Sequence, residues 1–279
     1  MPRVTRPPAA AQGRAATTGL AVPGLAHPLI APAEWAELAR PGAPLHWAAF
    51  DVSRGPGTRQ DPLYTEVTTR VRENGVPLLG TLDAAYGERP FGELVSDASR
   101  YLDWYHVDGF YLDRAPTGPE HAADCHWAVT TLRALLDHDA GTPRAQGGPG
   151  PADAPPCPEP PRPGLVVLGH GIHPHPRYAE LADQLVTFAG PWDRYRWSEA
   201  PPWTAAHPPS RFVHLVHSLP GLHLDGALRI ARWQGAATVC LTDRTAREGT
   251  DPWAGLPGYW DRLARATAAP AEDRPPPTM

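Results

Sequence analysis

The chain has 279 residues, 42% of them hydrophobic, and a formal net charge of −5. It contains no lysine, which excludes chemistry based on a Schiff-base lysine or on the lysine of a phosphate-binding P-loop. The acidic balance and the absence of a basic cluster argue against a nucleic-acid partner and against a membrane surface. No run of about 18 apolar residues and no apolar core of a secretory signal occurs, so a cytoplasmic protein is expected.

Three segments are rich in Pro, Gly and Ala and lack apolar periodicity, so they are expected to be unstructured. They are residues 1–17, 139–163 and 268–279. We therefore expect one domain over residues 18–267, which carries 139–163 as a Pro-rich insert. The three cysteines are too few and too scattered for a disulfide framework or a zinc knuckle; they are Cys125, Cys157 and Cys240.

Eight short apolar runs along the chain are typical of buried strands. In chain order they cover residues 19–27, 44–51, 76–83, 107–113, 165–171, 184–190, 211–218 and 237–243. Helical patterns separate most of them, at residues 62–74, 91–105, 119–138, 175–183 and 223–234. This alternation predicts an α/β protein with a parallel sheet, and eight repeats fit a single closed (β/α)₈ TIM barrel. A doubly wound open sheet is the alternative, although no GxGxxG turn follows the first run.

Acids and histidines follow the predicted strands. In a barrel the carboxyl ends of all strands meet on one rim, so these side chains are expected to share a pocket. Each Asp could instead cap the next helix or open a turn. The residues concerned are Asp51, Asp83, Asp113 and Asp243, together with His27, His170 and His217.

Asp83 and Asp113 end neighbouring strands and are the predicted catalytic pair. Two adjacent carboxyl groups push their pKa values apart, which provides one acid and one base for glycoside hydrolysis. Strand alternation places Gly109 and Tyr111 on the same face as Asp113. We expect the Asp113 carboxylate to contact Arg114 or a polar group of a neighbouring strand, because an unpaired buried charge is costly.

The segment GHGIHPHPRY (169–178) raises the hypothesis of a metal site through His170, His173 and His175. It has neither a carboxylate ligand nor the i, i+4 spacing of a helix, so a turn that contacts a ligand is the preferred interpretation. We predict no metal and no cofactor. Aromatic residues in the loops can pack in the core or stack on sugar rings; they are Tyr86, Trp192, Tyr195, Trp197 and Trp203.

Four stretches resemble the spherulation-specific family 4 (spherulin-4-like) proteins. They are YGERPFGELVSDASRYLDWYHVDGFYLD (86–113), HGIHPHPRYAELADQLVTFAGPWDRYR (170–196), PPWTAAHPPSRFVHLVHSLP (201–220) and DPWAGLPGYW (251–260). The resemblance implies a TIM barrel similar to glycoside hydrolases, and some secreted fungal members cut α-1,4-linked N-acetylgalactosamine polymers. It also implies Asp-Glu at the end of the fourth strand and a Glu in the sixth-strand motif TFEG. Asp113 matches the first acid, but Arg114 and Ala189 stand at the two Glu positions.

Three interpretations follow. The first is an enzyme acting on amino sugars with relocated acids, in which Asp113 works with Asp83 or Asp243. The second is a non-catalytic barrel that binds a carbohydrate or another small molecule, with Arg114 paired to an anionic group or to Asp113. The third is a structural or interaction module. The residues predicted to bind substrate are Asp51, Tyr86, Arg114, His170, Trp192, His217 and Asp243.

Overall fold

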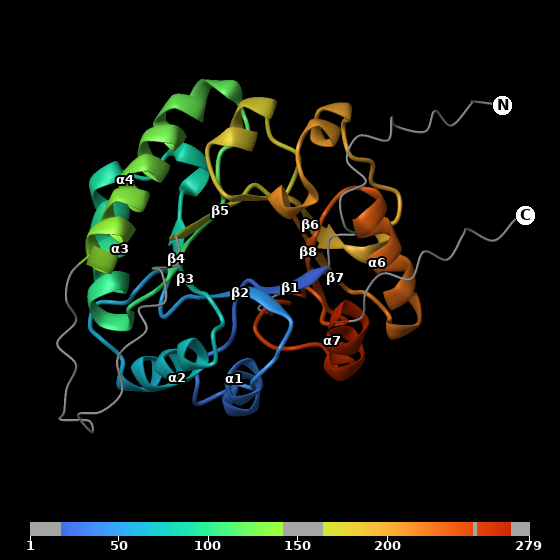
Figure 1. Ribbon diagram of the computed structural model, residues 1–279, viewed down its shortest axis with the longest axis horizontal. Coiled ribbons are helices and arrows are strands. Elements are labelled where there is room, and N and C mark those ends of the chain that lie inside the picture. Colours follow the sequence, from blue (N-terminus) through green and yellow to red (C-terminus); the bar gives the residue numbers. More distant parts are fainter. Residues whose placement is uncertain (1–17, 142–163, 248–249, 269–279) are drawn as a thin grey trace, which may run out of the picture.

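The computed structural model describes residues 18–141, 164–247 and 250–268. Eight parallel strands follow one another around a closed barrel, and the last strand pairs with the first (Figure 1). The predicted (β/α)₈ TIM barrel is therefore confirmed, and the open-sheet alternative is excluded. The strands are β1 (Gly19–Val22), β2 (Leu45–Phe50), β3 (Leu78–Asp83), β4 (Gly109–Asp113), β5 (Leu165–Gly169), β6 (Gln184–Pro191), β7 (Phe212–His217) and β8 (Thr238–Leu241).

Helices surround the barrel, and most of them lie where helical periodicity predicts them. They are α1 (Pro32–Leu38), α2 (Pro62–Glu73), α3 (Phe91–Tyr105), α4 (Ala122–Gly141), α5 (Trp192–Tyr195), α6 (Leu224–Trp233) and α7 (Trp260–Ala268). The helix predicted over 175–183 is wrong: a short 3₁₀ helix, η3 (Pro176–Glu180), stands there. Pro176 stands at the first position of this helix and disfavours a helical backbone at His175, and β6 already begins at Gln184, so little chain is left for a longer helix.

Two predicted segment boundaries need correction. Helix α4 continues through Gly141 and α7 includes Ala268, so residues 139–141 and 268 are helical. The rest of the predicted tails and insert (1–17, 142–163 and 269–279) lies outside the described residues. None of the described helices combines the length and the apolarity needed to cross a lipid bilayer.

Two apolar layers hold the barrel together, because successive side chains of a strand point to opposite faces. The inner layer fills the barrel and includes Trp47 and Tyr111, whose rings stack at 5.8 Å. The outer layer packs the strands against the helices and includes Phe50 and Tyr101. Burying each such ring stabilises the fold by about 1.5–3 kcal/mol. A Cβ at Gly80 would lie 2.5 Å from the Tyr101 ring, so this strand position requires glycine.

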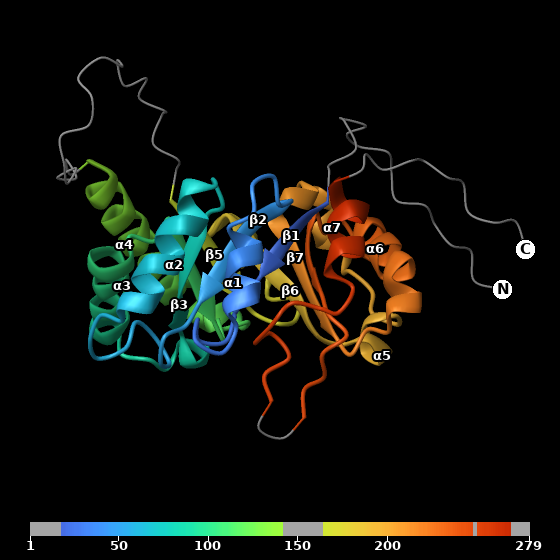
Figure 2. The ribbon, with the colours of Figure 1, turned by 90° about the horizontal axis from the view of Figure 1, so that it is seen from below.

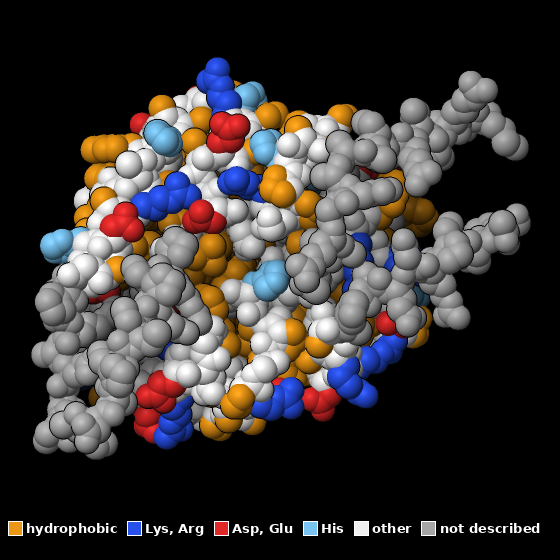
Figure 3. All heavy atoms as spheres, viewed as in Figure 1, with side chains coloured by type: hydrophobic (Ala, Val, Ile, Leu, Met, Phe, Trp, Pro, Cys, Tyr) orange, Lys and Arg blue, Asp and Glu red, His pale blue; other side chains and the backbone are white. Residues whose placement is uncertain are grey.

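The two ends of the barrel differ. Figure 1 and Figure 3 look onto the end where the strands begin, and there the visible acidic and basic side chains are interspersed around the edge. Figure 2 shows the barrel from the side, with the β8–α7 loop projecting from the opposite end, where the strands finish. Active sites of TIM barrels lie at this second end.

A buried polar pair outside the rim provides a test of stability. The Tyr195 hydroxyl lies 2.8 Å from Nδ1 of His214, and both residues are fully buried. Burial lowers the pKa of His214 to about 3, so the ring is neutral.

Tyr195→Phe is expected to lower the free energy of unfolding in urea by about 1–3 kcal/mol, because the buried imidazole loses its partner. Tyr259→Phe is the matched control: its hydroxyl bonds the Leu219 carbonyl at 3.1 Å in a partly exposed place, where water can substitute. Equal losses in the two variants would contradict the argument.

Candidate active site

A cavity of about 440 Å³ opens at the carboxyl-terminal rim of the barrel. Its walls come from the β1–α1, β2–α2 and β8–α7 loops and from the ends of β3 and β4. Three acids face it, accompanied by hydroxyl groups and aromatic rings. Its polar and aromatic lining includes His27, Asp51, Tyr64, Thr81, Tyr111, Asp113, Asp251 and Trp253.

Asp113 ends β4 and points into this cavity. Tyr111, two residues earlier, belongs to the inner layer of the barrel, so the predicted shared face is observed. The Tyr111 hydroxyl donates a long hydrogen bond of 3.4 Å to the Asp113 carboxylate. Desolvation raises the pKa of Asp113, and the nearby charge of Asp83 adds to the increase. A carboxyl group in this state suits proton donation.

Asp83, the predicted partner of Asp113, is held by Arg114. The guanidinium binds both carboxylate oxygens: Nε lies 2.8 Å from Oδ1, and the second bond joins Nη2 to Oδ2. Ala85 N–H also donates to Oδ1, at 2.8 Å. Desolvation alone would raise the pKa of Asp83, but the hydrogen bonds from Arg114 and Ala85 and the positive charges nearby outweigh it and lower the pKa. Asp83 does not line the cavity, and Arg114 pairs with it rather than with Asp113.

Arg114 and Tyr86 form one unit beside this pair. The Arg114 guanidinium carbon lies 5.5 Å from the centroid of the Tyr86 ring, a cation–π arrangement. Both residues have left-handed backbones, with φ of 52° at Arg114 and 59° at Tyr86. Tyr86 N–H also donates to the Arg114 carbonyl at 2.7 Å. The β3–α3 and β4–α4 loops are therefore joined by backbone and side-chain bonds, and such backbone strain is typical of functional sites.

Asp51 is the acid that shares the cavity with Asp113. It follows β2, is exposed at the mouth, and accepts the Gly55 N–H at 2.9 Å. Partial desolvation raises the pKa of Asp51, and the charge of Asp83 contributes a smaller increase. Asp51 and Asp113 thus line the same cavity, while Asp83, the partner that the sequence favoured, lies beside Asp113 in the strand register but outside the lining.

His27 forms part of the wall, and both of its ring nitrogens have partners. Nδ1 accepts the Leu29 N–H at 3.2 Å, so Nε2 carries the proton and donates to Asp61 at 3.0 Å. Asp61 also caps α2 by accepting the Leu63 N–H at 2.9 Å. His27 therefore fixes the β1–α1 loop to α2 and has no free nitrogen for proton transfer.

Four further predicted site residues do not line the cavity. His170 packs against Tyr178 on the helical side of β5, with ring centroids 4.9 Å apart. Trp192 stacks on His223 at 5.4 Å. The others are His217, whose Nδ1 lies 3.0 Å from the Ser218 hydroxyl, and Asp243, which accepts the Gly258 N–H at 3.1 Å.

The His170 ring is a poor candidate for a ligand to a metal. Burial lowers its pKa to about 4, and alternation along β5 turns it away from the barrel interior. The carbonyls of Ala115 and Pro116 raise this pKa slightly, yet neither ring nitrogen makes a well-formed hydrogen bond. Within the described part of the chain, no three His, Cys, Asp or Glu side chains gather as a metal site requires.

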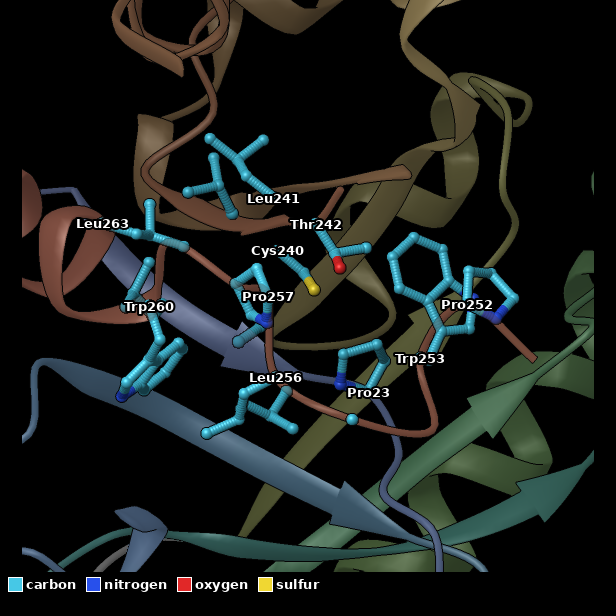
Figure 4. A pocket seen from close by; sticks show the side chains of 15 residues that line it. Pro23, Cys240, Leu241, Thr242, Pro252, Trp253, Leu256, Pro257, Trp260 and Leu263 are labelled. Atoms are coloured by element: carbon cyan, nitrogen blue, oxygen red, sulfur yellow. The ribbon is translucent and has the colours of Figure 1, made fainter. Parts of the chain in front are cut away.

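The sequence did not single out Trp253 and Asp251 as site residues. Both belong to the long β8–α7 loop and line the cavity. Asp251 accepts the Trp253 N–H at 2.9 Å, and the Trp253 ring packs on the inner layer of the barrel. Apolar side chains of the same loop lie over β1 and β8 and leave a gap of only about 10 Å³, so the loop is anchored (Figure 4). The stretch DPWAGLPGYW carried the family resemblance, but its sequence does not reveal that it folds back over the barrel mouth.

Ala189 lies on β6, level with Leu215 of β7 in the strand register. Leu215 belongs to the inner layer, so the Ala189 methyl group also faces the barrel mouth. The residue is exposed, and a Cβ built on Gly171 would lie 3.6 Å from its methyl group. No carboxylate occupies this position of the rim.

A closed (β/α)₈ barrel with an acid-lined cavity at its carboxyl rim defines the class of this protein. The sequence profile of spherulation-specific family 4 matches residues 21–267, so the chain belongs to that family.

Solved structures share the fold. Sph3 of Aspergillus clavatus, determined in complex with GalNAc, is similar with a TM-score of 0.70 and 22% identity over 91% of this chain and 98% of that chain. The spore cortex-lytic enzyme SleL of Bacillus megaterium is similar with a TM-score of 0.51 and 8% identity over 91% of this chain and 74% of that chain. No curated protein matches the chain.

The raised pKa of Asp113 leads to a prediction about stability. An acid whose pKa is higher in the folded state than in the unfolded state destabilises the fold at pH values above its unfolded pKa of about 3.9. The penalty grows until the pH exceeds the folded pKa and is absent well below pH 3.9. Asp113→Asn is therefore expected to increase the free energy of unfolding at pH 7 by about 1 kcal/mol and to have no such effect near pH 2.5. The measurement is urea unfolding at both pH values.

Asp83→Asn is the matched control with the opposite sign. The pKa of Asp83 is lowered in the fold, so its contribution stabilises above the unfolded pKa and is lost as the pH falls through the folded pKa. This variant should be less stable than the unmodified protein at pH 7. If Asp113→Asn instead lowered the free energy of unfolding at pH 7, the prediction would be wrong, and the Asp113 carboxylate would have to be stabilised in the folded state.

Proposed function

We propose that the protein binds an amino-sugar-containing saccharide in the rim cavity and does not hydrolyse it. The observation that carries this proposal is the fate of the family's three acid positions. Asp113 is present and faces the cavity. The second position holds Ala189, which has no carboxylate, and the third holds Arg114, whose guanidinium is bound to Asp83.

Carbohydrate binding is supported by the cavity itself. Its volume of about 440 Å³ lies within the range of about 300–1,000 Å³ that is usual for small-ligand sites. Trp253 offers a partly exposed aromatic face for the apolar side of a sugar ring, while Asp51 and Asp113 offer carboxylate oxygens to its hydroxyl groups. The structural neighbour from Aspergillus clavatus was determined with GalNAc bound, which favours a hexosamine.

Loss of hydrolysis is supported by the chemistry of the substituted positions. Alanine cannot transfer a proton, and arginine stays protonated at any physiological pH. Asp83 cannot replace the missing Glu while Arg114 binds both of its oxygens. Asp243, the other relocated acid considered, does not line the cavity.

One observation favours a second candidate function, that of a glycosidase with relocated acids. Asp51 and Asp113 line the same cavity, and burial raises the pKa of both. Two carboxyl groups so placed could act as general acid and base of a glycosidase with relocated acids.

The two functions are separated by measuring binding and turnover on the same ligands. Titration calorimetry with galactose, galactosamine, N-acetylgalactosamine and short α-1,4-linked oligomers should detect binding, while chromatography of the same mixtures should detect no product. Product formation that Asp51→Asn abolishes would establish the glycosidase instead. If no ligand of the panel is bound or hydrolysed, both candidate functions are wrong, and the interpretation as a structural or interaction module is left.

A further inference from the structure

The cavity carries negative charge that the described side chains balance only in part. Asp51, Asp113 and Asp251 reach it from three different loops or strand ends. Asp51 accepts the Gly55 N–H, Asp113 accepts the Tyr111 hydroxyl and Asp251 accepts the Trp253 N–H. Backbone hydrogen bonds from Arg54 to Asp51 and from Arg114 to Asp113 add to these. None of the three makes an ion pair with a described Arg or His side chain. The nearby charge of Arg54 lowers the pKa of Asp51 and that of Arg114 lowers the pKa of Asp113, but neither guanidinium forms an ion pair with these acids.

Two positive or ionisable groups of the rim are already engaged with other acids. Arg114 is bound to both oxygens of Asp83, and His27 donates to Asp61. A carboxylate that is partly desolvated and has no ion-pair partner costs stability, and this desolvation raises the pKa of Asp51 and of Asp113. A ligand that brings its own positive charge would offset this cost.

The remaining groups that line the cavity indicate what else such a ligand needs. The Thr81 side chain lies in the lining, and its hydroxyl oxygen is buried without a hydrogen-bond partner in the structure. Trp253 contributes a partly exposed ring to the same lining, beside the buried rings of Tyr64 and Tyr111. The ligand therefore needs a cationic donor, further polar groups and an apolar face, within about 440 Å³. A protonated amino sugar has all of these, because its ammonium group carries three donors on a compact ring.

We propose that the cavity selects a hexosamine with a free, protonated amino group over the N-acetylated sugar. This inference rests on the proposed binding of amino sugars and names the form that is bound. Acetylation replaces the ammonium by a neutral amide, so the sugar can no longer offset the charge of Asp51, Asp113 and Asp251. A charge-assisted hydrogen bond in such a place changes affinity by about 10- to 100-fold.

The first experiment varies the ligand and leaves the protein unmodified. Calorimetry compares galactosamine, N-acetylgalactosamine, galactose and galacturonic acid at low and at high salt. Galactosamine is expected to bind about 10- to 100-fold more tightly than N-acetylgalactosamine, with a preference that shrinks as salt screens the charges. If the N-acetylated sugar binds equally or more tightly, the inference fails and the proposed function stands. If no sugar binds, both fail. Tightest binding of galacturonic acid would overturn the inference in favour of recognition by Arg114.

The second experiment varies the protein and leaves the shape of the cavity nearly unchanged. Asp113→Asn and Asp51→Asn should each reduce the preference for galactosamine by about 10-fold or more while changing galactose binding much less. Glu88→Gln is the matched control, because it removes one negative charge from an exposed residue of the same rim outside the cavity. Equal losses for galactose and galactosamine in the Asp variants, or equal effects of Glu88→Gln, would contradict a role for the cavity charges. Circular dichroism verifies folding.

Discussion

The triple variant Arg114→Glu, Ala189→Glu, Asp83→Asn is expected to release product from a partly N-acetylated α-1,4-linked galactosaminoglycan, whereas the unmodified chain is not. The first two changes place carboxylates where the family resemblance implies them. The third is required by the structure, since a Glu at position 114 would otherwise face Asp83, which has lost its guanidinium. Positioned acid–base groups typically contribute about 10²–10⁴-fold each, so even partial recovery should be measurable by a reducing-sugar assay.

The restored position on β6 has room for a longer side chain, because Ala189 is exposed at the rim. The amide variant Arg114→Gln, Ala189→Gln, Asp83→Asn is the control: it has the same shapes without the new carboxylates, and it should stay inactive. Thermal unfolding must first show that both variants fold. Product formation by the unmodified protein, or by the amide control, would disprove the claim that the missing carboxylates limit catalysis.

The barrel is well predicted from sequence because its strands are buried on both faces. Runs such as residues 107–113 remain apolar whichever way their side chains point, and turn residues bound them on each side. Helix α3 is equally clear, since its apolar positions recur at helical spacing over the predicted residues 91–105. Helices α1, α5 and α7 were not predicted. Helix α1 has only 7 residues and begins at a proline, and α5 has only 4 residues, which gives little periodicity to detect.

For the site, the sequence predicts which residue types stand at which strand ends, but not the contacts between them. Sequence places Asp83, Asp113 and Arg114 on one rim, but it does not decide which carboxylate the guanidinium binds. That choice depends on backbone conformation: Arg114 has a φ of 52°, and its side chain reaches across to β3. Loop residues are less predictable still, because the path of the β8–α7 loop depends on packing against β1 and β8. Hence the place of Asp113 in the cavity wall was predicted from sequence, and that of Trp253 was not.

Trp253→Ala is expected to weaken the binding of every sugar that enters the cavity, by about 30-fold, or about 2 kcal/mol, as for a central aromatic contact in a binding site. The ring lies in the cavity wall and packs on the inner layer of the barrel, which holds it rigid and ready to stack. Trp253→Phe should keep part of the affinity, since it retains an aromatic face. Trp197→Ala is the control, because Trp197 is 76% exposed and lies outside the cavity. Calorimetry measures all three variants.

This loss should be the same for galactose, galactosamine and N-acetylgalactosamine, because stacking depends on the apolar face of the sugar and not on its charge. The Asp113→Asn variant should show the reverse pattern, a loss concentrated on galactosamine. The loop should keep its position without the indole, since Leu256, Pro257 and Trp260 pack beside β1 and β8 (Figure 4). Unchanged affinities in Trp253→Ala would place the sugar away from the β8–α7 loop. A loss of affinity confined to one sugar would mean that Trp253 positions the charged side chains of the cavity and does not stack on the sugar ring.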